Sequence, residues 1–279
     1  MKKNVLTEER IAQFRQHLMD EEKSEATIEK YVRDIRAFAA FAKGGQITKE
    51  LMMAYKKTLI REGYAVRSIN SMLASLNSFL SFFDLADCRV KNLRIQRQIY
   101  SPQEKELTKE EYFRLLEAAR AKPRLHLILQ TICSTGIRIS ELSYFTMEAV
   151  TTGEITVSCK SKTRKIFLPG RLRKQLLHYA RKRSIRTGII FRTCHGKAVN
   201  RSNIWAEMKA LCCAAKVNPE KVFPHNLRKL FARTFYRCEK DIAKLADLLG
   251  HSSINTTRIY IMTTGMEHRR KLERLGLVV

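Results

Sequence analysis

The sequence has few acidic residues and no long apolar run. Its 279 residues include 53 Lys or Arg but only 27 Asp or Glu, which gives a formal net charge of +26 at pH 7. Charges interrupt every apolar run before it reaches the roughly 20 residues of a membrane-spanning helix. No hydrophobic signal-peptide core follows the basic N-terminus. These absences predict a soluble, cytoplasmic protein with no membrane partner.

The spacings of metal ligands are also missing. The seven cysteines are odd in number and show no C-x-x-C pair, so without a secretion signal we expect free or buried thiols. Neither His195 beside Cys194 nor the pair Cys212–Cys213 has the spacing of zinc ligands. The sequence therefore predicts no metal site.

The basic residues are concentrated in one part of the chain. No acid occurs between Glu154 and Glu207, and residues 160–186 contain eleven Lys or Arg. A solvated surface normally mixes charges of both signs, so a long region of one sign favours binding to a polyanion. An anionic membrane is the competing partner, but no amphipathic helix with a large apolar face occurs there. Nucleic acid is therefore the predicted partner.

Apolar residues recur at helical spacing through the first 90 residues. One helix is expected over about 7–19, and others begin after Ser24, after Thr48 and after Gly63. The pattern predicts a small four-helix domain over 1–90. Residues 91–106 are basic and poor in apolar residues, which predicts a linker. Such a linker either follows a phosphate backbone or is merely solvated, and the sequence favours neither.

A second domain is predicted over 107–279. Thr108 and Glu111 form a capping-box pattern at its start, and helices follow. Residues favourable for strands at 154–158 and 165–168 flank a basic turn at 160–164, which predicts a hairpin. Helical patterns then resume. The expected fold is mainly α with a small antiparallel β-hairpin, an α+β arrangement.

Tyr260 is the candidate nucleophile. A phenol has a pKa of about 10 and attacks poorly at neutral pH unless cations and a proton acceptor lie nearby. The segment L-L-G at 248–250 is typical of a helix end with a C-cap glycine. A new helix from Ser252 or Ser253 carries Tyr260. Such a corner places His251 and Tyr260 on adjoining elements that can converge.

Two arginines and a second histidine extend this set. His225 and Arg228 lie one turn apart on a helix expected to begin at Pro224. Arg138 lies in the segment T-G-I-R-I-S-E-L, where Glu141 is placed to orient it. Arginine forks bind phosphate oxygens bidentately, and histidines exchange protons near neutral pH. The set predicts cleavage of a phosphodiester with formation of a phosphotyrosine.

The departing sugar 5′-oxygen requires a proton, and the basic hairpin contains lysines that can donate one. Lys160 and Lys162 are both candidates, and spacing alone does not separate them. The turn also contains Arg164 and Lys165, and we expect most of Lys162, Arg164 and Lys165 to contact the DNA backbone.

Together, T-G-x-R-x-S-E-L, a hairpin lysine, H-x-x-R, L-G-H and the tyrosine resemble the pattern of tyrosine recombinases of the phage-integrase family. The resemblance covers essentially the whole chain, and it implies a helical, SAM-like core-binding domain followed by a catalytic domain. Aligning the hairpin without gaps through Gly170 favours Lys160 over Lys162. The catalytic residues that the resemblance implies are Arg138, Lys160, His225, Arg228, His251 and Tyr260.

The resemblance also implies a mechanism and partners. A site-specific recombinase or integrase of this kind forms a 3′-phosphotyrosine and a free 5′-hydroxyl, and repeated exchange resolves a Holliday junction. No cofactor, metal ion or ATP is required. The expected assembly is a homotetramer on DNA, with the tail after Tyr260 docked on a neighbouring protomer; packing of the tail in cis stays open. Accessory DNA-bending proteins and an association with the nucleoid complete the expectation.

The chain departs from the family pattern in places. Cys159-Lys160-Ser161 stands where many relatives have G-K-G, which affects how far Lys160 can swing. Lys229 replaces a second histidine after H-x-x-R. The first helix begins within about ten residues of Met1, so no additional N-terminal arm-binding domain is expected.

Three other functions compete with recombination. A type IB topoisomerase-like enzyme shares the nucleophile but only relaxes supercoils; the separate helical domain and the short tail favour recombination. A catalytically silent DNA-binding regulator has no use for Tyr260. A relaxase acting on one strand is a weaker alternative.

Overall fold

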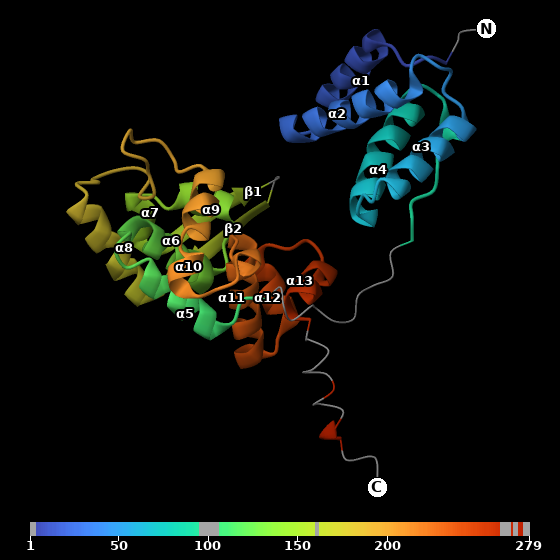
Figure 1. Cartoon of the computed structure of the whole chain (residues 1–279). Coiled ribbons are helices and arrows are strands. Elements are labelled where there is room, and N and C mark those ends of the chain that lie inside the picture. Colours follow the sequence, from blue (N-terminus) through green and yellow to red (C-terminus); the bar gives the residue numbers. More distant parts are fainter. Residues whose placement is uncertain (1–3, 95–105, 160–161, 263–268, 270–272, 276–279) are drawn as a thin grey trace. The chain divides into compact units, whose positions relative to one another are not determined.

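The computed structural model describes residues 4–94, 106–159, 162–262, 269 and 273–275. The chain divides into two compact units, residues 1–97 and 98–279, which we call the N-terminal and C-terminal units. Both consist mainly of helices, and the described residues form one two-stranded sheet (Figure 1). The predicted fold, mainly α with a small antiparallel hairpin, is confirmed. Among the described helices, none is long and apolar enough to span a bilayer.

The N-terminal unit packs its helices around a mainly aliphatic core that also contains aromatic rings. The hydroxyls of Thr7 and Thr48 accept hydrogen bonds from the first turns of the helices that follow them, as N-cap residues do. The rings of Phe14 and Phe79 meet edge to face with centroids 5.3 Å apart, a favourable geometry for aromatic pairs. The elements are α1 (Glu8–Asp20), α2 (Glu25–Ala42), α3 (Lys49–Arg61), α4 (Val66–Phe82) and the 3₁₀ helix η1 (Ala86–Cys88).

Two asparagines of α4 hold the segment that follows η1. The side-chain amide of Asn77 exchanges two hydrogen bonds with the backbone of Val90, at 3.0 and 3.2 Å. Asn70 does the same with Leu93, at 2.9 and 2.8 Å. The first residues of the segment predicted as a linker therefore lie against α4, because the asparagine amides supply the backbone partners that a strand would otherwise give.

The C-terminal unit begins with the predicted capping box. The Thr108 hydroxyl accepts from the Glu111 backbone at 3.2 Å, and the Glu111 carboxylate accepts from the Thr108 backbone at 2.8 Å. The elements are α5 (Lys109–Ala118), α6 (Pro123–Thr135), η3 (Ile139–Tyr144), α7 (Met147–Thr152), β1 (Glu154–Cys159), β2 (Lys162–Phe167), α8 (Gly170–Lys182), α9 (Arg201–Lys209), α10 (Cys212–Ala215), η4 (Pro219–Lys221), α11 (Pro224–Glu239), α12 (Ile242–Leu249) and α13 (Ile254–Ile261).

The hairpin is tighter than the sequence predicted. The expected turn at 160–164 is wrong, because β2 already begins at Lys162 and pairs it with Cys159. Arg164 therefore lies within the strand, opposite Val157. Val157 and Ile166 are buried, and residues two apart on a strand share a face. This register places the Arg164 side chain on the buried face of the hairpin.

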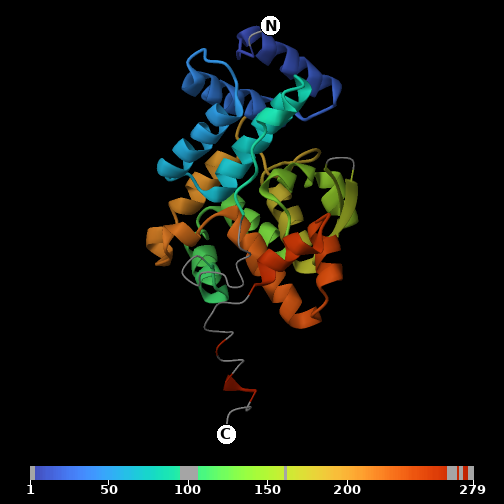
Figure 2. The same cartoon turned by 90° about the vertical axis from the view of Figure 1, so that its right-hand side faces the viewer.

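The end of α6 packs closely on α11. Gly136 ends α6 in the left-handed conformation, with φ +65°. A Cβ atom built at this position lies 2.3 Å from the ring of Phe231 and 3.1 Å from the side chain of Leu249. Glycine is thus required here both for its backbone conformation and for the close contact. This contact brings the segment after α6 next to α11, α12 and α13, which lie side by side in both views (Figure 1, Figure 2).

Replacing Gly136 by alanine is expected to destabilise the C-terminal unit strongly. Positive φ costs alanine about 1–2 kcal/mol, and the displacement of packed side chains adds about 1–3 kcal/mol. Gly188→Ala is the matched control, since Gly188 has φ +73° but no atom within 4 Å of a built Cβ. Denaturant unfolding of the two variants measures the difference. Equal losses would contradict the packing argument.

Candidate active site

Five of the six predicted site residues come together where η3, α11, α12 and α13 meet. The five are Arg138, His225, Arg228, His251 and Tyr260. Arg228 contacts His251, Tyr260 contacts His225, and Arg138 donates to the carbonyl of Gly250, the residue before His251. Lys160 lies outside the described residues, so its place in the site stays a prediction. Among the described residues, no group of three or more His, Cys, Asp or Glu is arranged to hold a metal ion.

Arg228 is the most deeply buried charge in this site, with 1% of its surface exposed. One Nη donates to the carbonyl of Gly136, and the other donates to the carbonyl of Leu249 at 2.5 Å. These carbonyls lie at the C-terminal ends of α6 and α12, where helix dipoles present partial negative charge. Burial, followed by the nearby charge of Arg138, lowers the pKa of Arg228 to about 10. The guanidinium therefore remains charged at neutral pH.

His251 is neutral in this environment. Its Nε2 lies 3.2 Å from Nη2 of Arg228, and its Nδ1 lies 2.9 Å from the hydroxyl of Thr257. A guanidinium only donates, so Nε2 accepts and the ring proton is assigned to Nδ1. Burial, followed by the charges of Arg228, Arg138 and Arg164, lowers the pKa of His251 to about 4.

Tyr260 lies between the two histidines and is 7% exposed. Its hydroxyl is 3.4 Å from Nδ1 of His225, and its ring centroid is 4.9 Å from that of His225 and 5.0 Å from that of His251. Burial, followed by the charges of Lys229 and the site arginines, lowers the pKa of His225. A neutral His225 can accept the tyrosine proton through Nδ1, because such contacts are often long before substrate binds.

Glu141 is the carboxylate that holds two arginines in place. It accepts from the backbone of Arg138 at 2.7 Å and from the Arg138 guanidinium at 3.0 Å. Arg164 donates to both carboxylate oxygens, at 3.0 and 2.8 Å. Burial raises the pKa of Glu141, but the hydrogen bonds and charge of Arg164 and Arg138 outweigh it and hold this pKa below its ordinary value. The predicted orientation of Arg138 by Glu141 is therefore present, and the carboxylate is ionised.

The charges of this site do not cancel. Three guanidinium groups, those of Arg138, Arg164 and Arg228, surround the single carboxylate of Glu141. Arg138 is the accessible one, with 37% of its side chain exposed. An excess of positive charge beside a tyrosine and a neutral histidine is suited to a phosphate group.

Comparison with known proteins identifies the family to which the chain belongs. The sequence model of the phage integrase family matches residues 105–265, more than half of the chain. The chain belongs to the phage integrase family. A second model, for the N-terminal SAM-like domain of phage integrases, matches residues 11–84. The chain is thus a tyrosine recombinase with an N-terminal SAM-like domain and a catalytic domain.

Individual relatives extend over nearly the whole chain. Tyrosine recombinase XerA of Pyrococcus furiosus is 29% identical, with 100% of this chain and 98% of the relative aligned. A lambda integrase dimer bound to a COC′ core site has a TM-score of 0.75 at 18% identity, covering 94% of this chain and 96% of that one. A lambda integrase tetramer bound to a Holliday junction has a TM-score of 0.73 at 19% identity, covering 92% and 78%. The structural likenesses show that this integrase-family chain shares their fold.

Sequence reasoning missed two residues of the integrase site. Most of the basic turn residues were expected to contact the DNA backbone, but Arg164 donates to Glu141, and Lys165 pairs with Glu154 at 3.0 Å. Strand alternation from Val157 and Ile166 is the signal that places Arg164 inward. Thr257 was not considered, although it lies one helical turn before Tyr260 on α13 and is fully buried.

Gly250 shows how closely Arg164 approaches the His251 turn. The glycine ends α12 with φ +62°, as its C-cap pattern predicted. A Cβ atom built here lies 2.7 Å from Nη1 of Arg164. The carbonyl of Gly250 also accepts from Arg138 at 3.4 Å. The hairpin, η3 and the histidine turn are therefore joined at one point.

Glu141→Gln is expected to destabilise the protein by about 3 kcal/mol, because it removes the counter-charge of the mostly buried Arg164 guanidinium and of Arg138. Glu154→Gln is the matched control on the same hairpin. Its pair with Lys165 is 46% and 64% exposed, and such surface pairs contribute about 0–1 kcal/mol. Urea unfolding measures both changes. A loss for Glu141→Gln no larger than the control's would contradict this account of the site.

The pKa of His251 predicts how stability depends on pH. In the unfolded chain histidine titrates near pH 6.5, whereas folded His251 titrates near 4. Between these values the unfolded state binds more protons, so the free energy of unfolding falls as pH falls from 7 to 5, by on the order of 1–2 kcal/mol. His251→Gln is expected to flatten this fall in unfolding experiments. An unchanged slope in that variant would show that other groups carry it.

Proposed function

We propose that this protein is a site-specific DNA recombinase that cuts and rejoins strands through a 3′-phosphotyrosine on Tyr260. The observation that carries the proposal is the Tyr260 hydroxyl 3.4 Å from His225 Nδ1, within a site of excess positive charge. Membership of the phage integrase family supports site-specific recombination in general. The covalent intermediate and the order of exchange belong to the proposal.

In the cleavage step Tyr260 Oη bonds to the scissile phosphorus, and the bond from phosphorus to the sugar 5′-oxygen breaks. The phenolic proton passes to Nδ1 of His225, whose lowered pKa keeps that nitrogen free to accept it. The departing 5′-oxygen takes its proton from a general acid, which we assign to Lys160. Attack by the 5′-hydroxyl of a partner strand reverses these steps and rejoins the DNA. The phosphotyrosine conserves the bond energy, so the scheme uses neither metal nor ATP.

The two catalytic arginines have different roles in this scheme. The exposed guanidinium of Arg138 is fixed by Glu141, and it can grip two non-bridging oxygens directly. Arg228 is held by carbonyls and by His251. Its charge acts on the phosphate from a desolvated position, where electrostatic stabilisation is strong. A direct contact requires Arg228 to exchange Leu249 or His251 for a phosphate oxygen.

The proposed substrate is double-stranded DNA, and the proposed assembly is a tetramer. The charge of +26 supports a polyanionic partner. Lambda integrase, which shares the fold, has been seen as a tetramer bound to a Holliday junction. Tail exchange between protomers belongs to the same proposal, since most of the tail lies outside the described residues. Accessory DNA-bending proteins and a location at the nucleoid belong to the same proposal.

Tyr260→Phe is expected to abolish covalent DNA linkage while leaving DNA binding intact, because only the nucleophilic oxygen is removed. The substrate is a pool of random-sequence duplexes, each nicked so that cleavage releases a short fragment and traps the adduct. Tyr236→Phe, which removes the same atom from α11 outside the site, is the matched control. Denaturing gels measure the adduct, and its sequence gives the target site.

The outcomes separate this proposal from its rivals. An adduct that persists in Tyr260→Phe would overturn the mechanism, because another residue would then be the nucleophile. Absence of an adduct from the wild type while DNA binding is strong would also overturn it and would favour a silent regulator. If the wild-type protein forms the adduct and relaxes supercoiled DNA but does not join two duplexes, it is a topoisomerase. Exchange between two duplexes carrying the recovered site supports recombination.

A further inference from the structure

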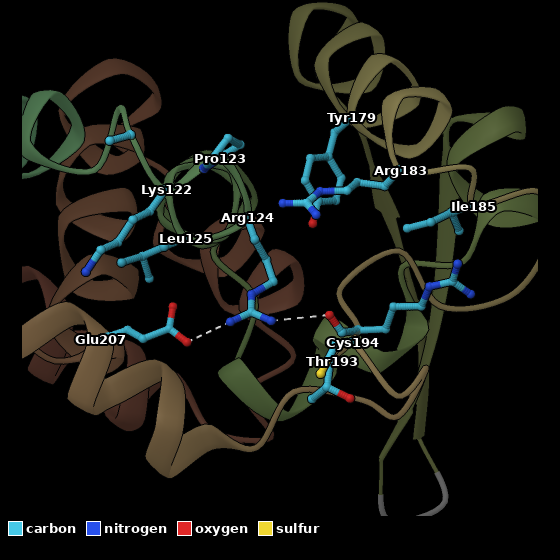
Figure 3. A pocket seen from close by; sticks show the side chains of 12 residues that line it. Lys122, Pro123, Arg124, Leu125, Tyr179, Arg183, Ile185, Thr193, Cys194 and Glu207 are labelled. Carbon is cyan, nitrogen blue, oxygen red and sulfur yellow. Dashed lines mark hydrogen bonds and ion pairs between the residues drawn. The ribbon is translucent and has the colours of Figure 1, made fainter.

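A second basic site lies in the C-terminal unit, away from Tyr260. It is a cavity of about 700 Å³ between the start of α6, the end of α8, the loop after α8, and α9 (Figure 3). Ligand pockets in proteins commonly measure about 300–1,000 Å³. We call it the α6–α8 pocket. Its basic lining residues are Lys122, Arg124, Arg183 and Arg192.

The α6–α8 pocket cannot hold the scissile phosphate. Pro123 at the first turn of α6 lines the pocket, whereas Arg138 follows the last turn of the same helix. A helix of 13 residues is about 20 Å long at 1.5 Å per residue. A ligand in the pocket is therefore about one helix length away from the phosphate that Tyr260 attacks.

The pocket carries uncompensated positive charge. Arg124 donates to Glu207 at 2.7 Å and to the Arg192 carbonyl at 3.3 Å, as the dashed lines in Figure 3 show. Within the described part of the chain, no ion pair or hydrogen bond holds the side-chain cations of Lys122, Arg183 and Arg192. Glu207, the acid in the lining, is already used by Arg124. The lining of the pocket therefore carries excess positive charge.

Tyr179 adds a hydroxyl donor to these cations. The residue is 8% exposed and lines the pocket from α8, and Figure 3 shows its hydroxyl end directed into the space between α8 and α6. No other described residue forms a hydrogen bond with this hydroxyl. The hydroxyl is therefore available to donate to a ligand in the pocket.

We propose that the α6–α8 pocket binds a phosphate-bearing ligand, with Arg183 and Arg192 gripping its oxygens and the Tyr179 hydroxyl donating to one of them. A single carboxylate would leave two of the three cations unmatched, whereas phosphates offer several charged oxygens to arginine forks. The ligand is either a backbone phosphate of bound DNA or a free phosphate compound such as a nucleotide. This proposal goes beyond the recombination chemistry and does not depend on Tyr260.

The test uses the full-length protein and three variants of the pocket, Arg183→Ala, Arg192→Ala and Tyr179→Phe. Arg181→Ala is the matched control, since it removes the same charge from α8 at an exposed position outside the lining. One arm measures calorimetric binding of inorganic pyrophosphate and of a nucleoside triphosphate. The other arm measures binding of a duplex over a range of salt concentrations. Thermal unfolding confirms that each variant is folded.

If a free phosphate compound is the ligand, each pocket variant weakens pyrophosphate or nucleotide binding by about tenfold or more, the worth of a charge-assisted hydrogen bond, and the salt slope for DNA matches that of Arg181→Ala. If DNA is the ligand, Arg183→Ala and Arg192→Ala each reduce the salt slope by about 1 relative to wild type, and they reduce affinity more than Arg181→Ala does. Variants that behave as Arg181→Ala does in both arms overturn the proposal. Because neither arm measures strand cleavage, failure of the recombinase mechanism would leave this result unaffected.

Discussion

A buried positive charge organises the catalytic half of this molecule. The Arg228 guanidinium has left water almost completely, which costs several kcal/mol unless partners replace the solvent. The partners are the carbonyls that end α6 and α12, together with His251. To satisfy one charge the fold must bring two helix ends and the histidine turn together. That requirement explains why Gly136 and Gly250, which end these helices, lie so close to other side chains.

A second set of interactions, made by Glu141, completes the site around Arg228. Glu141 joins Arg138 to Arg164, and Arg164 reaches the turn at Gly250. The hairpin that bears Lys160 is thus connected to the arginine proposed to grip the phosphate. Breaking these ion pairs costs free energy, because Glu141, Arg138 and Arg164 are each buried or half-buried and balance one another's charge. The excess positive charge that remains is what an incoming phosphate would neutralise.

Much of this fold and site could be predicted from local sequence signals. Thr108 and Glu111, Gly250 before His251, and the one-turn spacing of His225 and Arg228 each follow from rules that act within a few residues. The position of Arg164 could not be predicted in this way. The expected turn was too long, and strand register depends on pairing across the hairpin. Nor did the carbonyl partners of Arg228, which come from segments far apart in the chain. The role of Lys160 as the general acid stays a prediction.

The central claim is that the chain forms a covalent bond between Tyr260 and a DNA 3′ end. Mass spectrometry of the trapped adduct after nuclease and trypsin digestion tests it most directly. The account predicts a nucleotide attached through its 3′-phosphate to the tryptic peptide that contains Tyr260, residues 259–269 in the sequence. A nucleotide on any other peptide, or one linked through a 5′-phosphate, would contradict it.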